Sequence, residues 1–217
     1  MITSFTFNPF QENTYLLTAT NGNTILIDPG CYTPAEEKIL SDYIQSHGLR
    51  PVMLLLTHAH LDHILGNQWV FQTYGLRPRL HPLDLPDLHR LESYAPLFGV
   101  QAKASPEPEN FLVDGDQIQW DGPDIQIMQA PGHSPGSLCF YVPDLCSVIS
   151  GDVLFEGSIG RTDLPGGNHS TLLHSLHHVL MPLPGDTTVY SGHGGPTTIA
   201  QERDNNPFLQ GGSINLG

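Results

Sequence analysis

The amino-acid sequence predicts an α/β fold in one domain, with strands and helices in both halves of the chain. Its 217 residues fall within the usual size range of a single domain, which is expected to span residues 1–217. Short segments rich in Thr, Ile and aromatic residues predict strands, and amphipathic segments between them predict helices. Periodicity alone is compatible with one large sheet or two, and the repetition in both halves favours a four-layer α/β/β/α sandwich.

The first half is predicted to form strands and then helices. The segment from Thr33 to Glu36 resembles a capping box, with Pro34 at the first helical position. The run from Val52 to Leu56 lacks alternation, as expected of a strand buried on both faces. Strands are expected at residues 3–7, 14–18, 24–28 and 52–56, and helices from residue 34, at 64–74 and at 85–97.

The second half of the chain is also predicted to form strands and helices. A helix at 171–180 would place Leu172, Leu176 and Leu180 on one apolar face. Three histidines of that helix, His174, His177 and His178, are expected on its solvated face. Strands are expected at residues 117–120, 125–129, 138–142, 147–150 and 187–190, and a last helix after Pro196.

The charge balance argues against two classes of partner. Eight Lys plus Arg against 22 Asp plus Glu give a net charge of −14, which repels phosphate backbones and anionic lipid headgroups. No apolar stretch approaches the roughly 18 residues of a transmembrane helix, and the first residues lack a signal-peptide pattern. We therefore expect a cytoplasmic protein that binds neither nucleic acid nor membrane, with Cys31, Cys139 and Cys146 as reduced, mostly buried thiols.

The most informative segment runs from Thr57 to His63, directly after the buried strand. It holds four potential metal ligands, His58, His60, Asp62 and His63. Imidazoles and a carboxylate at this density suit borderline divalent metals such as zinc. From a loop at a strand end, His58 and His60 can reach one ion while Asp62 and His63 reach another.

Three later residues complete the set of candidate ligands. His133 lies in a sharp turn between two predicted strands, and Asp152 and His193 each follow a predicted strand. A glycine precedes each of the three, which lets the backbone approach a crowded centre. Singly each has an ordinary explanation as a turn or loop residue, but together with the histidine-rich segment they indicate a metal site.

This pattern resembles the metallo-β-lactamase-fold hydrolase superfamily over essentially the whole chain. Within that superfamily it is similar to the short glyoxalase II-like (hydroxyacylglutathione hydrolase-like) proteins. The segments that carry the resemblance are Thr57 to His63, Ala130 to Gly136, Gly151 to Phe155, Gly157 to Asp163, Ser191 to Gly194 and Asn206 to Leu209. The resemblance implies a four-layer αβ/βα sandwich and a metal-dependent hydrolase.

The resemblance also implies two divalent metal ions, with zinc expected first and iron or manganese as alternatives. The implied ligands are His58, His60 and His133 for the first ion, Asp62, His63 and His193 for the second, and Asp152 as a bridge beside a shared water or hydroxide. Two such cations, about 3.5–4 Å apart, need a bridging anion, and a carboxylate suits this place. Asp62 and Asp152 are thus expected to take part in catalysis, with a metal-bound hydroxide as the nucleophile.

The implied reaction is hydrolysis of a small thioester, S-2-hydroxyacylglutathione, to a 2-hydroxy acid and glutathione. The glutathione-binding helical domain of glyoxalase II is not expected here, because 24 residues follow His193. The net charge predicts weak binding of an anionic thiol unless a local cation helps. Arg161 is the candidate substrate residue, with capping of nearby loop carbonyls as its structural alternative. Asp28 either orients a ligand or is a plain turn residue.

Other activities compete with this one. Persulfide dioxygenases share the fold and a similar Gly160 to Asp163 stretch, but use a single iron, expected at His58, His133 and Asp152. A β-lactamase is disfavoured because those enzymes are exported and lack a carboxylate equivalent to Asp152. A non-catalytic metal-binding module is the alternative outside the enzymes, and measurable turnover of any thioester would exclude it.

Overall fold

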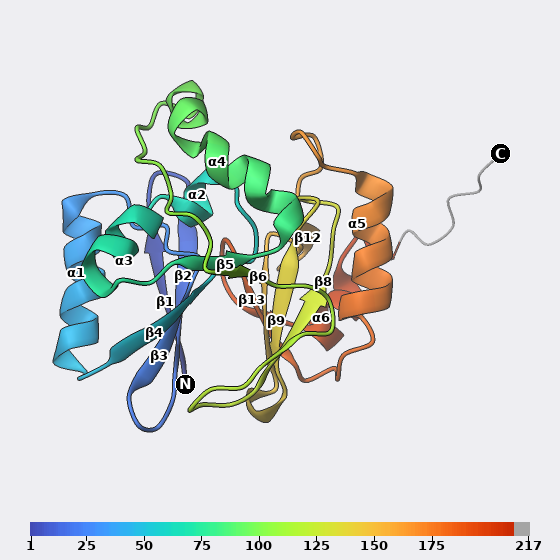
Figure 1. Cartoon of the computed structure of the whole chain (residues 1–217). Coiled ribbons are helices and arrows are strands. Elements are labelled where there is room, and N and C mark those ends of the chain that lie inside the picture. Colours follow the sequence, from blue (N-terminus) through green and yellow to red (C-terminus); the bar gives the residue numbers. More distant parts are fainter. Residues whose placement is uncertain (211–217) are drawn as a thin grey trace.

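The computed structural model describes residues 1–210 and contains two six-stranded sheets that pack face to face, with helices outside them (Figure 1). The first sheet contains β1 (Ile2–Phe7), β2 (Glu12–Thr18), β3 (Asn23–Ile27), β4 (Arg50–Leu55), β5 (Pro78–Leu80) and β6 (Asn110–Phe111), in that order. The second sheet has the order β14 (Thr197–Thr198), β13 (Thr188–Ser191), β10 (Ser147–Gly151), β9 (Leu138–Val142), β8 (Ile125–Gln129) and β7 (Gln117–Ile118). A separate two-stranded ribbon consists of β11 (Leu154–Phe155) and β12 (Ser158–Ile159).

The helices cover the outer faces of both sheets. They are α1 (Pro34–Ser46), α2 (Leu61–Ile64), α3 (Asn67–Tyr74), α4 (Leu85–Tyr94), α5 (His169–Ser175) and α6 (Ile199–Asn205). In Figure 1, α1 and α3 lie beside the first sheet, α5 lies beside the second, and α4 crosses above both. This arrangement confirms the predicted four-layer sandwich. None of the helices within residues 1–210 has the length and hydrophobicity needed to span a bilayer.

Adjacent residues of the central strands fill different layers, which explains why these strands are apolar on both faces. Leu16 packs toward the outer helices of the first sheet, whereas Leu17 packs between the sheets. In the second sheet, Cys139 packs toward α5 and Phe140 packs between the sheets. All four side chains are fully buried. Each of these strands therefore contributes side chains to two cores, one on each face, which is why its sequence does not alternate between apolar and polar residues.

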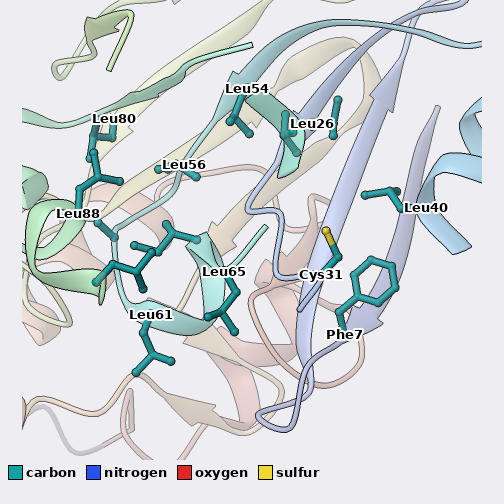
Figure 2. Close-up of a cluster of buried hydrophobic side chains, with 14 of the residues drawn as sticks. Phe7, Leu26, Cys31, Leu40, Leu54, Leu56, Leu61, Leu65, Leu80 and Leu88 are labelled. Atoms are coloured by element: carbon teal, nitrogen blue, oxygen red, sulfur yellow. The ribbon is translucent and has the colours of Figure 1, made fainter. Parts of the chain in front are cut away.

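Helix α4 is fixed by its buried face. Figure 2 shows the outer core of the first sheet, where Leu26 and Leu54 of the sheet accompany Leu40 of α1 and Leu88 of α4. These buried contacts therefore fix the position of the opposite face of α4 relative to the sheets.

Strand direction brings the ends of both sheets together at one edge of the molecule. β3 and β4 are parallel, as are β10 and β13, so each pair ends at the same edge of its sheet. The backbone N–H of Leu138 donates to the carbonyl of Thr57 at 2.8 Å and joins the start of β9 to the end of β4. Loops at the carboxyl ends of such strands are where α/β proteins place their sites.

Several predicted boundaries are corrected by the structure. The helix expected at 64–74 is two helices, α2 and α3, because the Gly66 N–H donates to the Pro29 carbonyl at 2.7 Å instead of to a helical carbonyl. The expected 85–97 helix ends its α-helical part at Tyr94 and continues as a 3₁₀ turn. The strand predicted at 117–120 ends at Ile118.

Other local predictions have mixed outcomes. The Thr33 capping box is present, with Thr33 Oγ1 accepting from the Glu36 N–H and the Glu36 carboxylate accepting from the Thr33 N–H. The helix predicted at 171–180 begins at residue 169 and ends in a π-helical turn. Cys31 and Cys139 are buried as expected, but Cys146 is exposed because it lies in the tight turn between β9 and β10.

Truncating Phe140 tests the inter-sheet core. Phe140 is 0% exposed, whereas Phe111 at the edge of the first sheet is 46% exposed. We expect Phe140→Ala to lower the free energy of unfolding by about 3–5 kcal/mol and Phe111→Ala to lower it by about 1 kcal/mol or less. Urea denaturation of both variants measures the difference, and equal losses would contradict the assignment of Phe140 to the core.

Candidate metal centre

All seven predicted ligands lie at the edge where strands of both sheets end. His58 and His60 follow β4, Asp62 and His63 lie in α2, His133 lies between β8 and β9, Asp152 follows β10, and His193 follows β13. The structure gathers them into two clusters of three side chains, with Asp152 between them.

The first cluster consists of three imidazoles. His133 Nε2 lies 2.7 Å from His60 Nδ1 and 3.2 Å from His58 Nε2. Burial is the main cause that lowers the pKa of all three histidines, to about 3 for His60, and the neighbouring imidazoles lower those of His58 and His60 further. The cluster is therefore uncharged at neutral pH, which is the protonation state that binds metals.

The second cluster combines one carboxylate with two imidazoles. Asp62 Oδ2 lies 3.2 Å from His193 Nε2 and 4.0 Å from His63 Nε2. The His63 side chain is fully buried, and its Nε2 has no hydrogen-bond partner among the described residues.

Asp152 contacts both clusters. Its Oδ2 lies 3.5 Å from His133 Nε2 of the first cluster and 3.5 Å from His193 Nε2 of the second. Its Oδ1 lies 3.3 Å from His63 Nε2 and has no hydrogen-bond partner among residues 1–210. A Cβ at Gly192 would collide with the Asp152 carboxylate, so the glycine before His193 is required by space.

Hydrogen bonds at Nδ1 determine which nitrogen of each histidine can bind a cation. His133 Nδ1 lies 2.9 Å from the Arg161 carbonyl, and His193 Nδ1 lies 3.1 Å from the Gln11 carbonyl. A carbonyl can only accept, so in both histidines Nδ1 carries a proton, and in the neutral form Nε2 presents a lone pair. Against the effect of burial, hydrogen bonds to Asp152 and Asp62 raise the pKa of His193 to about 9, so a cation that binds its Nε2 displaces a proton. His63 behaves in the same way, because its Nδ1 donates to Asp28 Oδ2 at 3.0 Å.

His58 reaches this tautomer through a relay. Thr57 Oγ1 has one proton, which it donates to Asp28 Oδ2. The hydroxyl oxygen must therefore accept from His58 Nδ1, 3.0 Å away, which leaves a lone pair on His58 Nε2. Asp28 thus contacts His63 directly and His58 through Thr57, which is the geometry expected of the ligand-orienting one of its two predicted roles.

The donor set fits divalent metal ions. Four Nε2 lone pairs point at the two clusters, and the unpartnered His63 Nε2 and Asp152 Oδ1 are buried atoms that a cation would satisfy. Imidazole nitrogens with carboxylate oxygens are the ligands that borderline divalent metals prefer.

Two buried carboxylates escaped prediction from the sequence. Asp84, at the start of α4, accepts from the Gly136 N–H at 2.7 Å, the Ser134 hydroxyl at 2.8 Å and the Ala59 N–H at 3.2 Å. It thereby ties the loop of His58 and His60 to the loop of His133. Burial raises its pKa to about 6, and these hydrogen bonds oppose the shift.

Glu12 is the second unpredicted carboxylate. It is fully buried at the start of β2, and its Oε1 lies 4.0 Å from His63 Nδ1, on the same side as Asp28. Burial raises its pKa well above the usual value. No local pattern distinguishes Asp84 or Glu12 from turn and strand acids, since the site residues that they approach are distant in sequence.

The structure contradicts one of the two roles predicted for Arg161, the capping of loop carbonyls, whereas its contact with substrate stays a prediction. Its carbonyl orients His133, whereas its guanidinium, with a side chain 59% exposed, pairs with Asp163 at 2.7 Å rather than with loop carbonyls. His174, His177 and His178 are exposed on the second-sheet side, as predicted.

A cavity of about 650 Å³ opens over the clusters. His60, Asp62, His133, Asp152 and His193 form its floor. Its walls are largely apolar, with Phe10, Leu61, Tyr94, Phe98, Phe155 and Ile159 among the lining residues.

The fold and these two clusters are those expected of a metallohydrolase, and comparison with known proteins supports this class. The family model of the metallo-beta-lactamase superfamily matches residues 7–193. The chain belongs to this superfamily, as its sequence motifs predicted.

Two sequence relatives match along nearly their whole length. A probable metallo-hydrolase, YqgX of Bacillus subtilis, is 42% identical over 95% of this chain and 96% of its own. The hydroxyacylglutathione hydrolase GloC of Haemophilus influenzae is 36% identical over 92% of this chain and 93% of its own.

Two solved structures are similarly close. The BLEG-1 B3 metallo-beta-lactamase has a TM-score of 0.88 at 36% identity, covering 97% of this chain and 100% of that one. The di-iron-bound form of TTHA1623 has a TM-score of 0.86 at 40% identity, covering 95% and 100%.

Removing the Asp84 carboxylate tests its role in joining the two ligand loops. Asp84→Ala leaves three buried donors without an acceptor, so we expect the free energy of unfolding to fall by about 2–4 kcal/mol. The control is Asp42→Ala, which removes an exposed ion pair with Lys38 and should change stability by about 0.5 kcal/mol or less. Urea denaturation measures both, and an Asp84 variant as stable as the control would refute the joining role.

Proposed function

We propose that this chain is a glyoxalase II-like hydrolase that binds two divalent metal ions and cleaves a small thioester. One observation carries the proposal: hydrogen bonds at Nδ1 leave Nε2 lone pairs directed at two adjacent clusters that share Asp152. The proposed ligands are His58, His60 and His133 for one ion and Asp62, His63 and His193 for the other, with Asp152 contacting both.

Metal ions held there would supply a water of lowered pKa and polarise a substrate carbonyl. The protein side chains provide the rest of the environment. Because only two of the seven donors are carboxylates, they would not neutralise two bound divalent ions, and the loaded centre would keep a net positive charge suited to an anionic transition state. Asp62 and Asp152 both line the cavity floor, where their free lone pairs can orient an attacking water by accepting its protons.

A thioester suits this site because its leaving group needs little help. A thiol has a pKa near about 8.5 and departs as the thiolate without a strong acid. The 36% identity to GloC, described as a hydroxyacylglutathione hydrolase, supports a 2-hydroxyacylglutathione as the substrate. The predominance of imidazole ligands supports zinc, and the di-iron form of the 40% identical TTHA1623 makes iron the alternative to test.

Assays of zinc-loaded and iron-loaded preparations test the activity. We expect both to hydrolyse S-D-lactoylglutathione, and chelation of the metal to abolish the reaction. Glutathione persulfide with an oxygen electrode tests a dioxygenase. A chromogenic β-lactam is included because a 36% identical structure is that of a B3 metallo-beta-lactamase. Oxygen consumption by the iron form, with no thioester cleavage by either preparation, would overturn the proposal.

Substituting Asp152 tests its place between the two ions. We expect wild-type protein to retain two metal ions per chain after dialysis, His193→Ala to retain about one, and Asp152→Ala to retain fewer than one. The reason is that Asp152 contacts both clusters whereas His193 belongs to one. Inductively coupled plasma mass spectrometry measures the content, and kcat/KM should fall about 10²–10³-fold in Asp152→Ala. Retention of both ions with near-normal turnover would contradict the shared role.

A further inference from the structure

The β11–β12 ribbon forms part of the cavity wall but has little structure of its own. Phe155, Glu156, Ser158 and Ile159 line the cavity, and the ring centre of Phe155 lies 6.2 Å from that of His193. Each strand of the ribbon has two residues, and so short a hairpin is not stable by itself. The shape of this wall beside the second cluster therefore depends on contacts with other elements.

The base of the ribbon is attached to the second sheet. The carbonyl of Leu154 accepts from the Ser191 hydroxyl at 2.6 Å and from the Ser150 hydroxyl at 3.2 Å. Ser150 belongs to β10 and Ser191 to β13, so these bonds fix the point where the ribbon leaves the sheet. They do not reach its tip at Gly157.

The tip is attached to the last helix, α6, and the residue that follows it. Glu202 and Asn206 are both buried. Glu202 Oε2 accepts from the Gly157 N–H at 2.9 Å, and Asn206 Nδ2 donates to the Ser158 carbonyl at 3.0 Å. Asn206 Nδ2 also donates to Glu202 Oε2 at 2.7 Å, and Glu202 Oε1 accepts from the Thr197 hydroxyl at 2.6 Å. We call the two bonds to Gly157 and Ser158 the α6–ribbon contact.

This contact gives a role to a buried carboxylate and a sequence motif that the metal centre does not use. Burying a carboxylate costs free energy that its three hydrogen bonds have to offset. Asn206 begins the Asn206 to Leu209 segment, on which part of the resemblance in sequence rests. The Phe208 N–H donates to Asn206 Oδ1 at 3.0 Å, which fixes the amide with Nδ2 toward the ribbon.

The ribbon tip borders two open spaces. Glu156 lines the main cavity and also a second hollow of about 390 Å³, whose other lining residues include Thr198 and Gln201. Open space cannot hold the tip in place. The hydrogen bonds of the α6–ribbon contact therefore determine where the tip lies and how wide the main cavity is on this side.

We propose that Glu202 and Asn206 are positioning residues that hold the tip of the ribbon and thereby set how large a thioester the cavity accepts. The size limit rests on the proposed thioesterase function, whereas the α6–ribbon contact does not. Both side chains act through the backbone of Gly157 and Ser158. Without them the wall no longer packs against a substrate that fills the cavity, while a substrate that reaches only the cavity floor is unaffected.

Two substitutions at Glu202 separate its hydrogen bonds from its volume. Glu202→Met keeps a side chain of similar length without a strong acceptor. Glu202→Gln keeps the contact, since its amide oxygen can accept from Gly157 and Asn206 while its NH₂ group donates to the Thr197 hydroxyl. Asn206→Ala removes the bond to Ser158 and serves as the second test if Glu202→Met does not fold.

Two thioesters of different size measure the effect on the cavity. S-D-lactoylglutathione carries a tripeptide on its sulfur, whereas S-methyl thiolactate carries the same kind of acyl group with a single carbon on the sulfur. We expect Glu202→Met and Asn206→Ala to lower kcat/KM for the larger thioester about tenfold, mainly through KM, and for the smaller one about twofold or less. Glu202→Gln should resemble the wild type. A loss of stability alone would lower both values equally, and equal losses would overturn the size limit.

Arg203→Gln is the matched control in the same helix. The Arg203 guanidinium donates to the carbonyls of Met181 and Leu183 at 2.6 Å and 3.1 Å, so this variant weakens the attachment of α6 without removing a contact to the ribbon. Its ratio of the two kcat/KM values should equal that of the wild type. A fall in this ratio as large as in Glu202→Met would refute the specific role of Glu202 and Asn206.

Hydrogen exchange separates failure of this inference from failure of the proposed function. Mass spectrometry follows amide exchange in a peptide that covers residues 153–160. We expect exchange there to be about tenfold faster in Glu202→Met, and unchanged in Glu202→Gln and Arg203→Gln. Unchanged exchange in Glu202→Met would overturn the α6–ribbon contact whatever the activity. Faster exchange together with a wild type inactive on both thioesters would overturn the proposed function, and the size limit with it, while the contact stands.

Discussion

The site depends on hydrogen bonds from histidine Nδ1 to fixed oxygen acceptors. Each imidazole can rotate and can carry its proton on either nitrogen, so five histidines near one another have many arrangements. The acceptors Asp28, Thr57, Arg161 and Gln11 select one arrangement for four of them, with the Nε2 lone pairs turned inward. A centre that is rigid before any ion arrives loses less entropy when an ion binds.

These acceptors lie far apart along the chain, so the site exists only when both sheets are packed. Gln11, in the hairpin between β1 and β2, orients His193 in the second half of the chain. Nearby, the Asn13 N–H donates to the Gly192 carbonyl at 2.8 Å, and the Tyr15 hydroxyl donates to the Ser191 carbonyl at 2.6 Å. Separation of the two sheets would therefore break the second cluster along with the inter-sheet core.

Prediction from the sequence succeeded where chemistry and spacing are local. The ligand-rich segment after β4 and the glycine before His193 are local patterns, and the structure brings all seven predicted ligands together. Asp84 and Glu12 were missed because the site residues that they approach are distant in sequence. Arg90 was missed because its partners in the same helix, Asp87 and Tyr94, give no sign that this side of the helix lines the cavity. The break at Gly66 was missed because the acceptor of its N–H, the Pro29 carbonyl, lies in another part of the chain. That the seven residues bind metal remains a prediction.

The residues that form one wall of the cavity and the residues predicted to bind metal lie on different segments of the chain. Residues 85–98 form one cavity wall but contain none of the seven predicted ligands, which lie on other segments. Asp84, just before this stretch, hydrogen-bonds to the ligand loops, and the buried side of α4 packs against α2, which carries Asp62 and His63. Insertions, deletions or recombination within residues 85–98 can therefore change which molecules are accepted while the reactive centre is inherited intact, provided that the Asp84 anchor and the buried side of the helix are kept.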